Sequence, residues 1–277
     1  MKWEKKAKET YNYGLIFDYK RNIKEIHYWL ISNKVIKFST FKKNLGKKTN
    51  LYTGQNSKNQ VSMDKIKTGQ NILKPLFSIP FINFIGITGS VSAKNAKIGD
   101  DIDVFIITRK NTLWLTRPLV LLFLELRGYR RSRKTSKKKQ QDLICTNLWM
   151  DDSNLKLPTE KQSLYTAHEV LQVFPVYDRD DTYHRFILEN IWTKKYLANA
   201  YHYKLGSINM KKNKNQLHWF ISKLINPINY LLYVIQLFIM FPKTKGEHVF
   251  YHQAYFHNHQ YSTKILQKHK KLNFKHI

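Results

Sequence analysis

Apolar and polar residues follow one another in blocks that predict two buried strands in the middle of the chain, then a helix and a third strand. Residues 81–88 and 102–108 are short apolar runs bounded by polar or turn-forming residues, as is typical of buried strands. Residues 113–126 are apolar over a stretch too long for a strand, which predicts a buried helix. The third strand is predicted at 143–150. This pattern predicts a core with a mixed sheet flanked by helices.

Helical spacing of apolar residues continues on both sides of this core. Residues 158–174 and 181–197 follow it, and Pro158 stands in a first-turn position. We expect a further helix at 216–241, another at the C-terminus, and a linker helix over 64–80. The expected fold class is therefore α+β, with a mainly helical C-terminal region.

The N-terminal part of the chain has a different outline. Helical patterns cover Tyr11–Phe17 and 23–31, and a short helix is expected at 41–45. Residues 46–63 are polar and rich in turn formers, with short apolar stretches that predict a hairpin. Three short helices and a hairpin outline a winged-helix-like module. The domains expected are this module at 1–63, a core at 64–155 and a helical region at 156–277.

The most apolar window, 228–241, is shorter than the roughly 20 residues that span a bilayer, and it contains Asn229 and Gln236. A buried helix is the favoured interpretation of this window and a membrane-surface helix the second, so we expect no spanning segment. The N-terminus has positive charge but lacks the apolar segment of a secretory signal. Cys145 is the single cysteine, which fits a reducing compartment, and we therefore expect a cytoplasmic protein.

The charge of the chain bears on its partners. There are 48 Lys and Arg against 19 Asp and Glu, a formal net charge of +29. Such an excess attracts polyanions such as RNA, DNA, nucleotides or anionic lipid. The abundance of Lys, Asn, Ile and Tyr is equally compatible with a general composition bias. The basic loop at 127–141 has three open interpretations, namely RNA binding, steering of a triphosphate, or an ordinary solvated loop.

Two acidic residues stand one residue apart at the second strand. Residues two apart in a strand point to the same face, so Asp101 and Asp103 project together while Ile102 and Val104 face the core. Two carboxylates held this close repel each other and lose hydration, which is costly unless a cation lies between them. Mg²⁺ prefers oxygen ligands and also binds phosphate oxygens. The pair therefore predicts a magnesium site.

A turn upstream of this pair is suited to phosphate. Gly89 lets the backbone approach a phosphate closely, and Ser90 offers a hydroxyl and a backbone N–H at the start of a short helix. A strand, Gly89-Ser90, ten intervening residues and then Asp101-Ile102-Asp103 resemble the signature of the polymerase-beta-like nucleotidyltransferase superfamily. Four further stretches resemble uncharacterised bacterial and archaeal members of that superfamily: 16–31, 158–197, 228–241 and 250–259.

This resemblance implies roles for the residues of both motifs. In the superfamily the Gly-Ser turn holds the triphosphate of a nucleotide, a role that falls here on Gly89 and Ser90. The paired acids bind catalytic Mg²⁺, which implies that Asp101 and Asp103 are both metal ligands and catalytic residues. A third acid on a later strand completes the site and helps to deprotonate the acceptor hydroxyl.

The third acid is harder to place than the pair. Asp142 stands just before the strand predicted at 143–150, and we assign the catalytic and metal-binding role to it. Asp151 and Asp152 lie at the far end of that strand, and strict alternation puts Asn147 on the face opposite to Asp142.

The resulting hypothesis is a Mg²⁺-dependent nucleotidyltransferase. It would transfer a nucleoside monophosphate from a nucleoside triphosphate to an acceptor hydroxyl and release pyrophosphate, with the C-terminal helical region as the other wall of the cleft. No motif identifies the acceptor. The alternative is a non-catalytic nucleic-acid-binding protein that keeps the fold and binds through the winged-helix-like module and the basic loop. A third interpretation, a peripheral membrane protein, depends on residues 221–241 and the positive charge.

Overall fold

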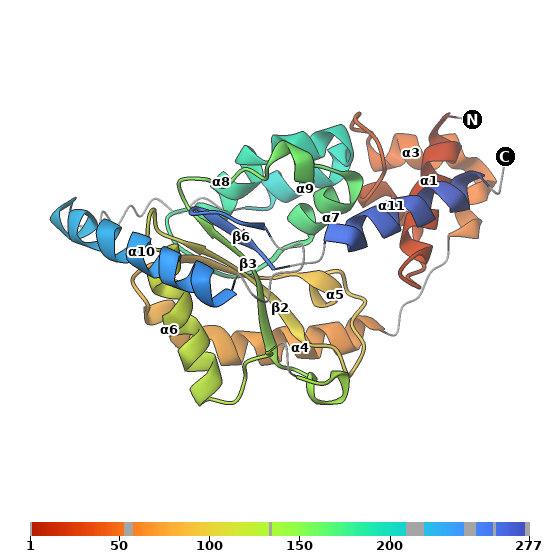
Figure 1. The fold of residues 1–277 in the computed structure, drawn as a ribbon. Coiled ribbons are helices and arrows are strands. Elements are labelled where there is room, and N and C mark those ends of the chain that lie inside the picture. The colour runs from red at the N-terminus through yellow and green to blue at the C-terminus, as the bar shows by residue number, and fades with distance from the viewer. Residues whose placement is uncertain are drawn as a thin grey trace.

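The chain folds as an α+β protein around a mixed sheet (Figure 1). The computed structural model describes residues 2–52, 58–132, 135–208, 219–240, 248–256 and 259–274. Over these residues the sheet has six strands in the order β4-β1-β2-β3-β6-β5. The strands are β1 (Ile82–Ile87), β2 (Ile102–Thr108), β3 (Ile144–Asp151), β4 (Phe174–Asp178), β5 (His248–Val249) and β6 (Gln253–Tyr255).

Strand β2 is central and separates two apolar layers. It is antiparallel to β1 and parallel to β3, while β4 and β6 continue the sheet in antiparallel fashion on either side. Ile102, Val104 and Ile106 are fully buried on one face of β2, whereas Phe105 and Ile107 are fully buried on the other. This alternation is the one that the sequence predicted for the strand.

Helices cover both faces of the sheet (Figure 1). One face carries α4 (Lys58–Leu73), α6 (Leu113–Leu126) and α10 (Trp219–Met240). The other carries α7 (Leu164–Gln172), α8 (Thr182–Glu189) and α9 (Ala198–Gly206). The short α5 (Gly89–Ser92) follows β1 directly. Single 3-10 turns are found at Lys74–Ser78, Lys137–Lys139, Thr159–Lys161 and Ile191–Lys195.

The N-terminal helices form a small unit with its own apolar core. These are α1 (Lys2–Leu15), α2 (Ile23–Tyr28) and α3 (Phe38–Leu45), and their core includes Ile26, Leu30 and Phe41, all fully buried. Helix α11 (His259–Phe274) packs against α1, so the two ends of the chain lie near each other (Figure 1). Asn22 caps α2 by accepting a hydrogen bond from Glu25 N at 3.0 Å.

The hairpin predicted at 46–63 is wrong where the structure describes these residues. Gly46–Leu51 form a 3-10 helix, and residues from Lys58 onward belong to α4. The helical pattern of the expected linker helix simply starts six residues earlier than 64, because Lys58–Met63 contain no helix breaker. Residues 53–57 lie outside the described part of the chain. The three helices of the winged-helix outline are present, but its wing is not among the described residues.

Two elements of the C-terminal half also differ from the sequence expectation. The helix predicted at 158–174 begins only at Leu164, because the Ser163 hydroxyl caps it by accepting from Thr166 N at 3.2 Å. Residues 174–178 form the edge strand β4, where Pro175 is tolerated. Strands β4, β5 and β6 all follow residue 155, so the sheet is not confined to the core predicted at 64–155.

None of the described helices is long and apolar enough to cross a membrane, which agrees with the expectation for 228–241.

The predicted bounds of β2 and α6 coincide with the observed ones, and β3 is displaced by one residue from 143–150.

Candidate functional site

The acidic pair lies at the N-terminal end of β2, as the sequence predicts. Asp103 is inside the strand on the face opposite to Ile102 and Val104, and its carbonyl accepts a hydrogen bond from Thr88 N at 2.9 Å. The carboxylates of Asp101 and Asp103 and the sulfur of Cys145 lie within 4.8 Å of one another. All three residues are partly exposed, so this cluster is accessible from solvent.

Gly89 brings the turn after β1 against this pair. Its φ of +64° is a backbone conformation that favours glycine, and a Cβ at this position would overlap the Asp103 carboxylate. Ser90 follows at the start of α5, and its hydroxyl donates to Asp100 Oδ2 at 3.0 Å. Asp100 also accepts from Lys97 N at 2.9 Å, which makes it a loop residue, as expected. The structure thus brings Gly89 and Ser90 beside the pair.

The surroundings of Asp103 disfavour the ionised form of its carboxyl group. Burial, together with the negative charges of Asp101 and Glu169, raises its pKa to about 8 against the opposing effect of Arg131. Asp101, whose side chain is 13% exposed, is instead paired with Arg131, Nη1 to Oδ2 at 2.7 Å. One carboxylate of the pair therefore has a cationic partner, while the other lacks one among the described residues.

Strand β3 supplies two residues of this site that were not predicted for it. Cys145 is the register partner of Asp103, and its thiol donates to Asn147 Oδ1 at 2.8 Å. The Asn147 amide in turn donates to Asp103 Oδ1. The register moves from Val104↔Thr146 to Phe105↔Leu148, so that Asn147 is the extra residue of a bulge. Alternation from Ile144 already places Cys145 and Asn147 on the face of Asp103, and the bulge changes the alternation only from Leu148 onward.

Asp142 does not join the acidic pair, which corrects the predicted third acid. Its neighbour in the strand, Ile144, belongs to the apolar layer on the side of α4, away from Asp103. Asp142 has a φ of +58° in the turn before β3, and its carboxylate forms an ion pair with Lys65 Nζ of α4 at 2.6 Å. Lys65 also donates to the carbonyls of Ile98 and Asp100, each at 2.8 Å. This arrangement fastens α4 to the loop before β2.

A further acid whose charge acts on the pair is carried by a helix. Glu169 of α7 lies close enough to Asp103 for its charge to raise the pKa of that carboxyl. Burial raises the pKa of Glu169 itself to about 7. Its charge also acts on Tyr165 of the same helix and on Tyr261 of α11. The sequence signal for Glu169 is a lone acid in an apolar helix, and no motif marks it.

The donor set fits a hard divalent cation. Asp101 and Asp103 offer carboxylate oxygens, which Mg²⁺ prefers, and a cation there would stabilise the ionised form of Asp103, whose pKa is raised. The sulfur of Cys145 is a poor ligand for Mg²⁺. Burial raises the pKa of its thiol to about 12, so it stays protonated and acts as a hydrogen-bond donor.

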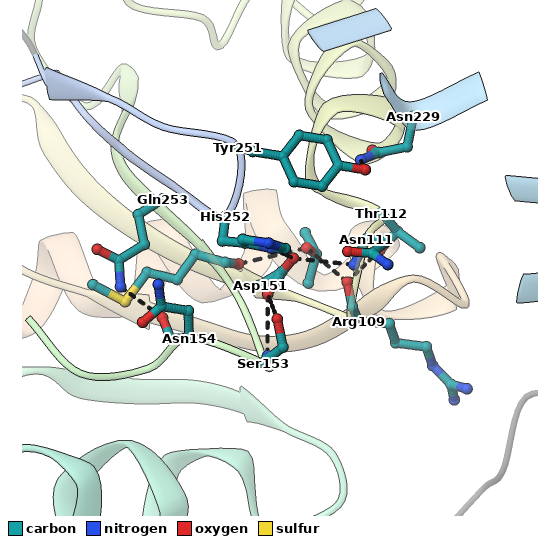
Figure 2. A network of polar contacts seen from close by, with 12 residues as sticks. Arg109, Asn111, Thr112, Asp151, Ser153, Asn154, Asn229, Tyr251, His252 and Gln253 are labelled. Carbon is teal, nitrogen blue, oxygen red and sulfur yellow. Dashed lines mark hydrogen bonds and ion pairs between the residues drawn. The ribbon is translucent and has the colours of Figure 1, made fainter. Parts of the chain in front are cut away.

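A second polar cluster lies at the other end of β3 (Figure 2). There the fully buried Asp151 accepts from Asn111 N at 3.0 Å, from Ser153 N at 3.1 Å and Oγ at 2.5 Å, and from His252 Nδ1 at 2.7 Å. Cavities of about 130 Å³ and 310 Å³ lie beside this cluster, lined by residues that include Asp152 and Tyr251. Neither of these cavities is lined by the acidic pair.

Comparison with known proteins does not identify the chain. No protein-family model matches it, and neither does any curated protein or solved structure.

Proposed function

We propose that the protein is a Mg²⁺-dependent nucleotidyltransferase with its site at the N-terminal end of β2. The observation that carries this proposal is the contact of a positive-φ glycine with one of two adjacent carboxylates. Gly89 lets the turn pack directly against the Asp103 carboxylate, where a Cβ would overlap it, and Asp103 lacks a cationic partner among the described residues. A glycine turn held against an uncompensated acid suits the binding of a metal-bound triphosphate.

The roles of the residues follow from this arrangement. Asp101 and Asp103 would hold Mg²⁺, which when bound stabilises the charge that develops on the phosphate oxygens. Gly89 and Ser90 would lie along the triphosphate. The acceptor hydroxyl forms a bond to the α-phosphorus, the bond to pyrophosphate breaks, and the hydroxyl proton passes to Glu169. We assign that last role to Glu169 because a carboxyl with a pKa of about 7 takes up a proton readily at neutral pH.

The test is transfer of a radiolabelled nucleoside monophosphate. The protein is incubated with each α-labelled triphosphate and Mg²⁺, with and without total cellular RNA, and the labelled product is identified. We expect wild-type protein to transfer label and Asp101→Asn and Asp103→Asn to lose at least about 10³-fold of that activity. Folded variants with wild-type activity would refute the proposal.

A second function is favoured by one specific contact. Arg131 already neutralises Asp101, and Asn147 rather than an acid reaches Asp103 from β3. A site of this kind can be a decayed one in a protein that binds nucleic acid through its positive charge. Such a protein would bind RNA with an affinity that falls steeply with salt and is indifferent to Mg²⁺. The enzyme, in contrast, would bind a nucleoside triphosphate only together with the divalent metal.

A further inference from the structure

Helix α10 turns two of its polar residues, Asn229 and Gln236, inward. Asn229 is fully buried, and its Oδ1 accepts from the backbone N–H groups of Trp114 at 2.8 Å and Leu115 at 3.0 Å. Gln236 is 8% exposed and donates to Trp114 O at 2.7 Å. The Asn229 amide also donates to the Tyr251 hydroxyl at 2.9 Å (Figure 2). These bonds fix which side of α10 faces the protein, namely the side that carries its amides.

The opposite side of α10 is apolar and exposed. Ile228, Leu231, Ile235 and Phe238 recur at intervals of three or four residues, which places them on one helix face. Their exposed fractions are 49%, 59%, 43% and 76%, and Ile239 beside them is 62% exposed. We call these five residues the outer face. A surface helix normally has the reverse polarity, with its apolar side toward the core.

The neighbouring helix adds to this exposure. Helix α6 contacts α10 and leaves Leu119, Leu122 and Leu126 exposed by 45%, 57% and 77%. Monomeric proteins rarely expose large apolar residues in such numbers on adjacent elements, so a surface of this kind marks an interaction site.

The charge of the protein indicates what kind of partner this apolar surface binds. A second copy of the chain would bring two net charges of +29 together, which opposes self-association. Arg127 and Arg130 follow α6 directly, and in the sequence α10 stands between lysine-rich segments, with Lys212 and Lys214 before it and Lys243 after it. An apolar helix face flanked in the sequence by basic residues is the combination by which peripheral proteins bind an anionic bilayer.

We propose that the outer face of α10 binds the surface of an anionic lipid bilayer, with the helix lying in the plane of the headgroups. The apolar side chains would enter the boundary between headgroups and acyl chains, while Asn229 and Gln236 keep α10 attached to α6. This binding is independent of nucleotidyl transfer.

Vesicle flotation tests this proposal with a matched pair of variants. Vesicles of phosphatidylcholine alone are compared with vesicles that contain phosphatidylglycerol, at low and high salt. The Leu231→Ser/Phe238→Ser variant removes two exposed apolar residues from the outer face. The control, Val35→Ser/Ile191→Ser, removes two residues that are 52% and 57% exposed on other elements. Circular dichroism verifies that both variants are folded.

We expect wild-type protein and the control to float with the anionic vesicles, and the outer-face variant to float at least about tenfold less. High salt should weaken flotation of the wild type. The proposal would be overturned if wild-type protein did not float, or if the outer-face variant floated as well as the control. It would also be overturned by sedimentation velocity showing a dimer that the outer-face variant dissociates, since the face would then bind a second copy.

Discussion

The two ends of the β2–β3 pair treat an aspartate in opposite ways. At the C-terminal end, Asp151 is fully buried and accepts four hydrogen bonds, one of them from His252 (Figure 2). At the N-terminal end, Asp103 accepts from Asn147 alone among the described residues and stands next to Asp101. The Asp151 carboxylate links three loops by hydrogen bonds. The Asp103 carboxylate, in contrast, lies where burial and the charge of Asp101 disfavour its ionised form.

This contrast distinguishes an acid that stabilises the fold from one to which we assign a function by proposal. A buried carboxylate whose hydrogen bonds are all made stabilises the fold, and its neighbours explain why it is there. Asp103 has no such explanation, because burial and the charge of Asp101 both raise its pKa, to about 8. A ligand that brings positive charge would give one. The predictions below test whether the two ends differ in this way.

The largest effect is expected at the N-terminal end. Asp103→Asn should lower the rate of nucleotidyl transfer by at least about 10³-fold, because a metal ligand is lost. The same change should raise the free energy of unfolding by about 1–2 kcal/mol at pH 7, since the repulsion from Asp101 disappears. Urea denaturation and the transfer assay measure the two effects on one protein. A variant that is both less stable and fully active would contradict the contrast.

The opposite pattern is expected for the matched change at the other end. Asp151→Asn should lower the free energy of unfolding by about 2–4 kcal/mol, because an amide cannot accept all the bonds that the carboxylate accepts. Transfer activity per folded molecule should stay within about threefold of the wild type, since the acidic pair lies at the other end of the sheet. Urea denaturation is again the measurement. A neutral effect on stability would show that the network is not structural.

A buried histidine extends the contrast to pH. His168 is 2% exposed, and neither ring nitrogen has a hydrogen-bond partner among the described residues. Burial lowers its pKa well below 6.5, and the positive charges of Arg21 and His269 act in the same direction. At acidic pH the unfolded chain therefore binds a proton at His168 that the folded chain does not bind. The free energy of unfolding falls as the pH drops below about 6.5.

The corresponding measurement compares two proteins at two pH values. Between pH 7 and pH 5 the wild type should lose about 1–2 kcal/mol more than His168→Phe, which has no group to protonate at that position. Equal losses in the two proteins would show that His168 does not contribute to acid sensitivity.

The smallest effect on activity is expected for Asp142. Its carboxylate is bound to Lys65 on the other side of the sheet, so Asp142→Asn should keep transfer activity within about threefold of the wild type. Stability should fall by about 1 kcal/mol, because Lys65 keeps two carbonyl acceptors. A loss of activity as large as that of Asp103→Asn would restore Asp142 as the third acid.

The sequence predicted the acidic pair because β2 is a short apolar run interrupted by one acid. Residues 102–107 are apolar on both sides of the sheet except at Asp103, so both the strand and the odd residue were visible. The face of Asp103 followed from period-two alternation. Gly89 was recognised from its place after a strand, and the structure adds the reason, a contact that excludes a Cβ.

The rest of the site depends on tertiary contacts that no local pattern contains. Asn147 contacts Asp103 from the neighbouring strand, and the ion pair with Lys65 holds Asp142 on the other side of the sheet. The charge of Glu169 acts on Asp103 because α7 packs on that face of the sheet. Strand β4 was not predicted, because its five residues follow a helix without a turn signal and include a proline. Such features are fixed by packing rather than by periodicity.

Calorimetric titration of ATP into the protein tests the central claim most directly, namely that Asp101 and Asp103 hold a divalent cation together with a triphosphate. We expect binding in the presence of Mg²⁺, a reduction of at least about tenfold in affinity when EDTA replaces the metal, and the same reduction in Asp103→Asn. Asp142→Asn, as the matched control, should bind like the wild type. Binding that is unaffected by EDTA and by Asp103→Asn would contradict the account.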